Sequence, residues 1–192
     1  MLKAFEFCLP KAAKAVPAGP DWIHELKHDG IRLIARKDGT CVCLWSRHGW
    51  NRTADFATIA DALRSLPVGE AVLDGEAVAH CEAGLPDFHR TLSSAGQRTA
   101  CLLAFDLLAV DGEDLRTLPL LARRARLEAV LENAPPALRF SEHMDGEHGE
   151  AMFRHACAMG LEGIVAKKLT APYLSGRRSS WLKIKNPGYL RP

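Results

Sequence analysis

The sequence predicts an α+β fold in which two antiparallel sheets, flanked by helices, enclose a cleft. Short apolar-alternating runs separated by Asp-Gly pairs have the form of strands joined by tight turns. Helical and strand-like segments are mixed without the regular alternation of a doubly wound fold. These two observations favour antiparallel pairing over a parallel sheet.

The predicted strands are Trp22–Lys27, Ile31–Lys37, Thr40–Arg47, Ala71–His80, Thr99–Val110, Leu138–His143, Leu161–Lys168 and Trp181–Lys185. The predicted helices are Ala54–Leu66, Leu118–Asn133 and a segment near Glu147–Met159. In the second helix, the spacing places Leu121, Ala125, Leu127 and Leu131 inward. The same spacing leaves Arg123, Arg124 and Arg126 as solvated charges.

We expect one domain over residues 1–192, with an irregular lead-in at residues 1–20. The chain is 47% hydrophobic and 25% charged, the balance of a globular protein. Its formal net charge of +2 excludes a histone-like basic protein, so contact with nucleic acid would need a local patch.

The cysteines and the hydropathy pattern favour a reducing, cytoplasmic setting. No two cysteines form a C-x-x-C pair, and Cys41 and Cys43 alternate along a predicted strand as small buried residues on one side. No apolar segment approaches membrane-spanning length, so we expect no membrane partner.

The segment Lys27-His28-Asp29-Gly30-Ile31-Arg32 offers a nucleophile. A lysine at a strand end, followed by an Asp-Gly turn, is held on rigid backbone with its amine in a cleft. Attack on phosphorus needs the unprotonated amine, which neighbouring cations or desolvation favour. Taken alone, this segment is more simply a turn.

Two further segments carry polar groups beside glycines. Arg47, in Ser46-Arg47-His48-Gly49, is suited to a phosphate or a ribose, or is a surface charge beside a turn. In Leu73-Asp74-Gly75-Glu76, a hairpin turn explains Asp74 and Gly75. It does not explain Glu76, which we expect to pair with a cation, a ribose or a metal.

Three later segments complete the series. Phe105, in Phe105-Asp106-Leu107-Leu108, is either core or a platform for a purine. Glu162 stands beside Gly163 ahead of a β-branched run. Lys183 and Lys185 share one strand face, which suits a polyphosphate or a solvated edge.

In this order and spacing, the segments resemble the collinear motifs of covalent nucleotidyltransferases, the superfamily of DNA ligases, RNA ligases and mRNA-capping enzymes. Residues 22–32 and 176–185 look most like the ligase module of bacterial end-joining DNA ligases. The resemblance covers roughly residues 20 to 187. It implies the ATP-grasp-like ligase nucleotidyltransferase fold around a nucleotide cleft.

The resemblance also implies roles for these residues. Lys27 would take up AMP from ATP as a lysyl-AMP phosphoramidate and pass it to a 5′-phosphate at a DNA nick. Glu25 would lie beside adenine, and Phe105 would stack on it. The ribose and phosphate contacts would come from Arg32, Arg47, Glu76, Lys183 and Lys185. Glu162 and Glu76 would hold Mg²⁺ or Mn²⁺.

The implied partner is nicked or broken double-stranded DNA, in a nucleoid-associated setting. Family ligases add an OB-fold domain after the Trp-Leu-Lys-Ile-Lys segment, and residues 186–192 are too few to form one. We therefore expect no OB domain within residues 1–192, and an end-joining or OB-domain partner in trans is possible. The alternatives are a non-catalytic module that binds nucleotide or DNA ends, and an RNA ligase or capping-type enzyme.

Overall fold

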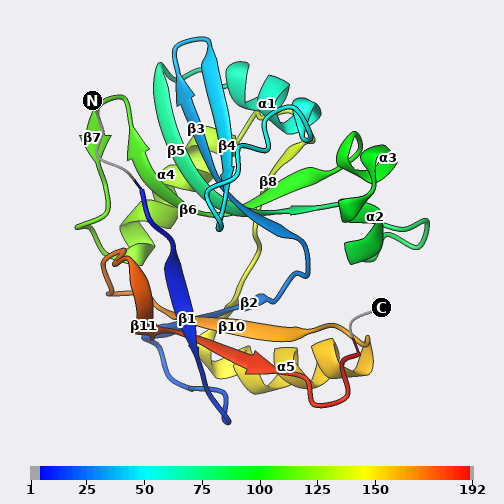
Figure 1. The fold of residues 1–192 in the computed structure, drawn as a ribbon. Coiled ribbons are helices and arrows are strands. Elements are labelled where there is room, and N and C mark those ends of the chain that lie inside the picture. The colour runs from blue at the N-terminus through cyan, green and yellow to red at the C-terminus, as the bar shows by residue number, and fades with distance from the viewer. Residues whose placement is uncertain (1–4, 191–192) are drawn as a thin grey trace.

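The computed structural model describes residues 5–190 and arranges them as two sheets that face each other (Figure 1). Sheet A has the strand order β1-β11-β10-β2-β9. Its strands are β1 (Cys8–Ala12), β2 (Trp22–Leu26), β9 (Met144–Asp145), β10 (Gly163–Lys168) and β11 (Gly176–Lys185).

Sheet B has the order β4-β3-β5-β6-β7, and β8 pairs with β6 beside that path. Its strands are β3 (Ile31–Asp38), β4 (Cys41–Ser46), β5 (Glu70–Val78), β6 (Cys101–Val110), β7 (Glu113–Asp114) and β8 (Leu138–Phe140). The prediction of an α+β fold with two facing sheets is confirmed.

Helices cover the outer faces of both sheets (Figure 1). Apolar residues of α1 (Ala57–Arg64) and α4 (Leu120–Leu131) pack on sheet B in the largest hydrophobic core, and α5 (Gly149–Ala158) packs on sheet A. The short α2 (Phe88–Leu92), α3 (Ser94–Gln97) and the 3-10 helix η1 (Gly146–His148) lie in connections and were not predicted as separate elements.

The inner faces of the two sheets follow from the two-residue period of strands. In sheet A, Ile164, Ala166 and Ile184 pack toward α5, so Val165, Lys167 and Lys183 point toward sheet B. In sheet B, alternate residues of β3 and β5 pack into the helix-covered core, so Arg32 and Glu76 point toward sheet A. The cleft that the sequence predicts would lie between these inner faces, and Lys27 and Glu162 line a cavity of about 150 Å³ at one end of it.

Two predictions about strand pairing are wrong. β2 and β3 do not form a hairpin, because β2 belongs to sheet A and β3 to sheet B, and residues 27–30 cross between the sheets (Figure 1). Gly30 permits this crossing, since a Cβ there would lie 2.3 Å from the Ala77 carbonyl oxygen. The sheets are also not wholly antiparallel, because β1 runs parallel to β11 and β8 runs parallel to β6.

The lead-in at residues 1–20 is not irregular throughout. Residues 8–12 form β1, which pairs with β11 along the edge of sheet A. Residues 1–4 lie outside the described residues. The Pro, Ala and Lys residues of this stretch give no strand-like alternation. The pairing partner of the strand, β11, lies at the other end of the chain, so local sequence does not indicate it.

In α4 the predicted face is wrong. Arg123 and Arg124 are buried, while Leu121 is 62% exposed and Ala125 is exposed as well; Leu127 and Leu131 face inward as predicted. Both arginines meet buried carboxylates, which compensate for the cost of burying charge. Arg126 is exposed, as predicted, and pairs with Glu113.

Two smaller predictions also fail. Cys41 is exposed and Cys43 is partly exposed, and both lie on β4, an edge strand of sheet B. Asp74 and Gly75 do not form a turn, since both lie inside β5. Gly75 sits at an irregularity in the β5–β6 pairing, where a Cβ would lie 2.8 Å from the Leu103 carbonyl oxygen.

No helix among residues 5–190 is long and apolar enough to cross a membrane.

Candidate functional site

Lys27 stands at the mouth of the cleft, at the end of β2. Its backbone N–H donates to the Gly163 carbonyl at 2.9 Å, and Gly163 pairs with Lys185 on β11. Lys27 and Lys185 therefore flank a glycine in one row across sheet A. The next row inward holds Glu25, Val165 and Lys183, and the one after that holds Ile23, Lys167 and Trp181.

Glu162 joins the two lysines of the mouth. Lys27 Nζ donates to one Glu162 oxygen at 2.5 Å, and Lys185 Nζ lies 3.0 Å from the other. The lysine side chains are 21% and 60% exposed, while Glu162 is only 6% exposed. A charged ligand can reach these lysines from solvent and compete for their partner.

Gly163 keeps the mouth open. Its φ of +131° lies in the left-handed region, and a Cβ there would lie 2.1 Å from the Ile184 carbonyl oxygen. With no side chain between Lys27 and Lys185, both amines can converge on one group.

Lys183 adds a third cation to the mouth. Partial burial lowers its pKa, and the nearby charges of Lys185, Lys27 and Arg177 lower it further. Like charges held this close are stabilised by an anion between them. The structure therefore brings together Lys27, Glu162, Lys183 and Lys185, all predicted from the sequence.

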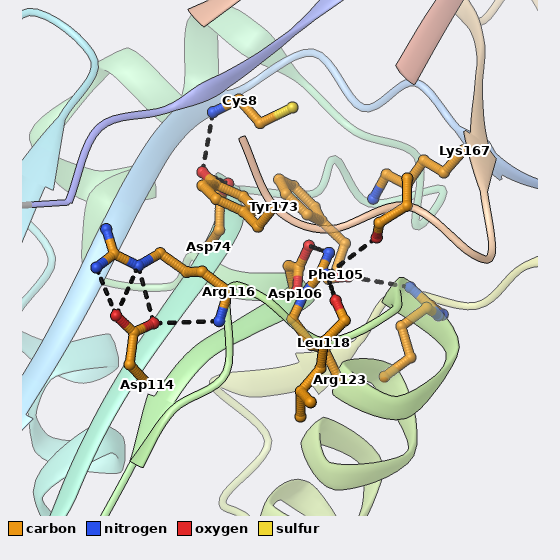
Figure 2. Close-up of polar contacts among 12 residues, drawn as sticks. Cys8, Asp74, Phe105, Asp106, Asp114, Arg116, Leu118, Arg123, Lys167 and Tyr173 are labelled. Atoms are coloured by element: carbon orange, nitrogen blue, oxygen red, sulfur yellow. Dashed lines mark hydrogen bonds and ion pairs between the residues drawn. The ribbon is translucent and has the colours of Figure 1, made fainter. Parts of the chain in front are cut away.

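Arg32 points toward sheet A from sheet B, with its guanidinium beside the rings of Phe105 and Trp181, and it is firmly anchored. It donates two hydrogen bonds to Asp74, at 2.9 and 2.7 Å, and Asp74 also accepts one from Tyr173 at 2.7 Å. Figure 2 shows Tyr173 between the Asp74 carboxylate and the backbone of Cys8, whose N–H donates to the hydroxyl at 3.0 Å. β1 is thus tied to β5 beneath the arginine.

Glu76 lies opposite Arg32 on β5 and has no hydrogen-bond or ion-pair partner among the described residues. Burial raises its pKa to about 7, against the opposing charges of Arg32 and Lys27. A carboxylate in this state is stabilised by any cation or hydroxyl donor that enters the cleft.

Phe105 is 9% exposed and packs edge-on against Trp181, with ring centroids 5.8 Å apart. Lys167 Nζ lies 4.0 Å from its centroid and the Arg32 guanidinium carbon 5.2 Å. Phe105 therefore belongs to a buried core cluster that includes Trp181, with two cations beside its ring, and its stacking on a base stays a prediction.

Glu25 is the shared anion at the inner end of the cleft. It is 2% exposed and accepts hydrogen bonds from Lys167 at 2.9 and 2.8 Å and from Arg124 at 2.6 Å. Burial lowers the pKa of Lys167, and the charge of Glu25 opposes this shift. Glu25 therefore lies in a buried ionic cluster. Its position beside a base stays a prediction.

A second buried pair lies next to Phe105. Arg123 donates to both oxygens of Asp106, at 2.7 and 2.8 Å, and to the Leu118 carbonyl at 2.6 Å (Figure 2). Burial raises the pKa of Asp106, and the bond from Arg123 opposes the shift. The two pairs fasten α4 to the inner end of the cleft.

Arg47 lies apart from this set. It is exposed on the turn after β4 and lines a cavity of about 520 Å³ together with Phe5, Phe7 and Trp45. Its predicted contact with the nucleotide stays a prediction.

Sequence reasoning missed Lys167 and Arg124 as site residues. Lys167 had a usable signal, because it follows Gly163 and Val165 at a period of two on the same strand face. Arg124 had none, since its helical position made it look solvated.

The carboxylates of the cleft fit a divalent cation that arrives with phosphates. Among residues 5–190 no three His, Cys, Asp or Glu side chains cluster into a metal site. Magnesium commonly binds through one or two carboxylates, completed by water and substrate phosphates. Glu162 and Glu76, one on each side of the cleft, suit that mode.

Comparison with known proteins gives a consistent result. Residues 7–185 match the family model described as the ATP dependent DNA ligase domain. Among curated proteins, the chain is 39% identical over 188 residues to the multifunctional non-homologous end joining protein LigD of Pseudomonas aeruginosa. That match covers 94% of this chain and 22% of the relative. The chain is also 36% identical over 174 residues to the SPbeta prophage-derived DNA ligase-like protein LigB of Bacillus subtilis, a match that covers 88% of this chain and 63% of that relative.

Two solved structures are also similar. One is a mycobacterial DNA ligase D complexed with ATP and MES, with a TM-score of 0.75 and 32% identity over 94% of this chain and 62% of that one. The other is the ligase domain of LigD from M. tuberculosis, with a TM-score of 0.79 and 31% identity over 93% and 58%. The chain belongs to the ATP-dependent DNA ligase domain family, as a ligase adenylation domain.

Proposed function

We propose that this domain forms a covalent lysyl-AMP at Lys27 and transfers the AMP to a 5′-phosphate at a DNA nick, where a 3′-hydroxyl displaces it to seal the strand. The observation that carries the proposal is the mouth of the cleft, where Lys27 shares Glu162 with Lys185 beside a side-chain-free Gly163.

The first step uses the mouth as a phosphate site. Neutral Lys27 Nζ attacks the α-phosphorus of ATP, a P–N bond forms, and the bond to pyrophosphate breaks. Because an ammonium has no lone pair to donate, Lys27 must leave its ion pair with Glu162 and give one proton to water before it attacks. The nitrogen gives a second proton to water as the P–N bond forms. Lys183 and Lys185 neutralise the triphosphate, which is the main demand of phosphoryl transfer.

The remaining residues orient the nucleotide. Arg32, fixed by Asp74, points at the ribose and phosphates, with Arg47 as a further predicted contact. The base lies inward over Val165, between Glu25 and the Phe105 end of sheet B. Glu162 and Glu76 would hold Mg²⁺ or Mn²⁺, which neutralises phosphate charge when bound.

The DNA steps rest on the family and the relatives. The chain spans only 22% of the Pseudomonas LigD relative, so DNA sealing by the whole protein and its part in end joining remain proposals. An OB-fold domain or an end-joining partner supplied from elsewhere would assist these steps.

The test is incubation of the chain with magnesium and ATP labelled on the α-phosphate, followed by denaturing gel and intact mass. Wild type should gain one AMP, Lys27→Ala should gain none, and the control Lys168→Ala should label like wild type. On addition of nicked duplex DNA, the label should leave the protein and appear on the DNA.

Labelling of Lys27→Ala would contradict the assignment of the nucleophile. A wild-type chain that binds ATP but never labels would favour the non-catalytic binding module. Transfer to nicked RNA in preference to nicked DNA would favour the RNA ligase alternative.

A further inference from the structure

We propose that Arg124 of α4 is a positioning residue for the base half of the nucleotide site. It holds the Glu25 carboxylate and the Phe105 backbone at a fixed separation across the two sheets. The inference rests on the proposed function, because it assigns the base to the end of the cleft between these residues.

The contacts of Arg124 span both sheets. Its Nη1 donates to Glu25 on β2 at 2.6 Å and to the Phe105 carbonyl on β6 at 3.2 Å. Its Nη2 donates to the Ser141 carbonyl at 2.7 Å and lies 3.0 Å from His143 Nδ1, in the link from β8 to β9. One guanidinium therefore joins the two residues that the sequence assigns to the base, one from each sheet.

The cluster is closed, so a shift at one member moves the others. Lys167 donates to both Glu25 oxygens and lies against the Phe105 ring, while Ser141 donates to Glu25 at 3.3 Å. A planar guanidinium presents its donors at fixed angles, whereas a lysine offers one flexible point charge. Arg124 thus fixes an orientation that Lys167 alone does not.

A purely mechanical tie between sheets would not need charge. Well-packed apolar residues often replace buried ion pairs without loss of stability. Here Arg124 is 3% exposed and its fork is divided between a side chain and two backbone carbonyls that flank the inner cleft. Such an arrangement fixes the position of the Glu25 carboxylate relative to the backbone at Phe105.

Within residues 5–190, Arg124 forms no hydrogen bond or ion pair with the mouth residues Lys27, Lys183 or Lys185. Its loss should therefore weaken contacts to the base and spare contacts to the phosphates. Arg126, two residues along the same helix, is exposed and pairs with Glu113, so it is a matched control.

The experiment measures binding by calorimetry in a Lys27→Ala background, where no covalent step occurs. The ligands are magnesium-ATP and magnesium-tripolyphosphate, which has the phosphates but no base. With Arg124→Lys, the Kd for ATP should rise about tenfold to a hundredfold, the effect of losing a charged hydrogen bond. The Kd for tripolyphosphate should stay within about twofold, and Arg126→Met should change neither.

Lys183→Met supplies the reverse pattern, since it should weaken tripolyphosphate and ATP together. Arg124→Met is a harsher variant that leaves Glu25 short of a partner, so Arg124→Lys carries the test if Arg124→Met does not fold. In chain that keeps Lys27, Arg124→Lys should raise the KM for ATP in labelling and leave the rate at saturating ATP within about threefold.

The inference is overturned if Arg124→Lys binds ATP like Arg126→Met, or if its Kd values for ATP and tripolyphosphate rise by the same factor. Those outcomes leave lysyl-AMP formation intact and so spare the proposed function. A chain that binds no ATP at all would overturn both.

Discussion

Two carboxylates of the cleft are each shared by two cations, and their surroundings are opposite. At the mouth, Glu162 pairs with Lys27 and Lys185, whose side chains are 21% and 60% exposed. At the inner end, Glu25 pairs with Lys167 and Arg124, whose side chains are 2% and 4% exposed. Water can replace the partner of a mouth lysine, but it cannot replace Glu25 without opening the fold.

This difference separates two uses of charge. A pair near water is easily exchanged, because screening makes it contribute little to stability. A buried pair is costly to break, because the remaining charge stays desolvated. At the mouth, the lysines can therefore exchange their ion pairs with Glu162 for contacts with a triphosphate. The inner end can keep its shape while this exchange takes place.

The largest expected effect comes from closing the mouth with a methyl group. In Gly163→Ala the Cβ would meet a backbone oxygen at 2.1 Å in a left-handed conformation, so we expect a loss of about 3 kcal/mol or more. Urea unfolding measures it. The control Gly39→Ala, with φ of +56° and nothing within 4 Å, should lose only about 1 kcal/mol. Equal losses would show that the contact with Ile184 is not limiting.

A smaller effect should appear in the pH dependence of stability. The pKa of Glu76 is raised from 4.5 to about 7 in the folded chain, so between these values the folded state keeps a proton that the unfolded state releases. Stability contributed by this group therefore falls as pH rises from 4.5 to 7 and is level above it.

Glu76→Gln lacks this titration. Relative to wild type it should gain about 2 kcal/mol of stability between pH 5 and pH 7.5. Urea unfolding at the two pH values gives the difference. A constant offset between the two proteins would mean that Glu76 is ionised throughout.

The sequence was sufficient for the mouth and for most strands. Strand alternation places Lys183 and Lys185 on one face, but Lys27 and Glu162 are 135 residues apart, so their common site was implied only by the resemblance of the ordered motifs to a known family. The crossing of residues 27–30 between sheets was missed, because an Asp-Gly pair that crosses looks like one that turns.

The inner end was not predictable from local pattern. The partner of Arg123 lies 17 residues away in sequence and that of Arg124 lies 99 residues away. Helical spacing identifies which residues share a face, but it does not show that a buried carboxylate on another element pairs with an arginine on that face. For the same reason the β1 strand was missed, since it pairs with β11.

The contrast between the two shared carboxylates is tested most directly by the free energy of unfolding of Glu25→Gln and Glu162→Gln, measured in urea at neutral pH. Glu25→Gln should lose about 3–5 kcal/mol, because Lys167 and Arg124 would stay buried without an anion. Glu162→Gln should lose less than about 1 kcal/mol, because Lys27 and Lys185 can turn to water. Equal losses, or a larger loss in Glu162→Gln, would contradict the division between an exchangeable mouth and a fixed inner end.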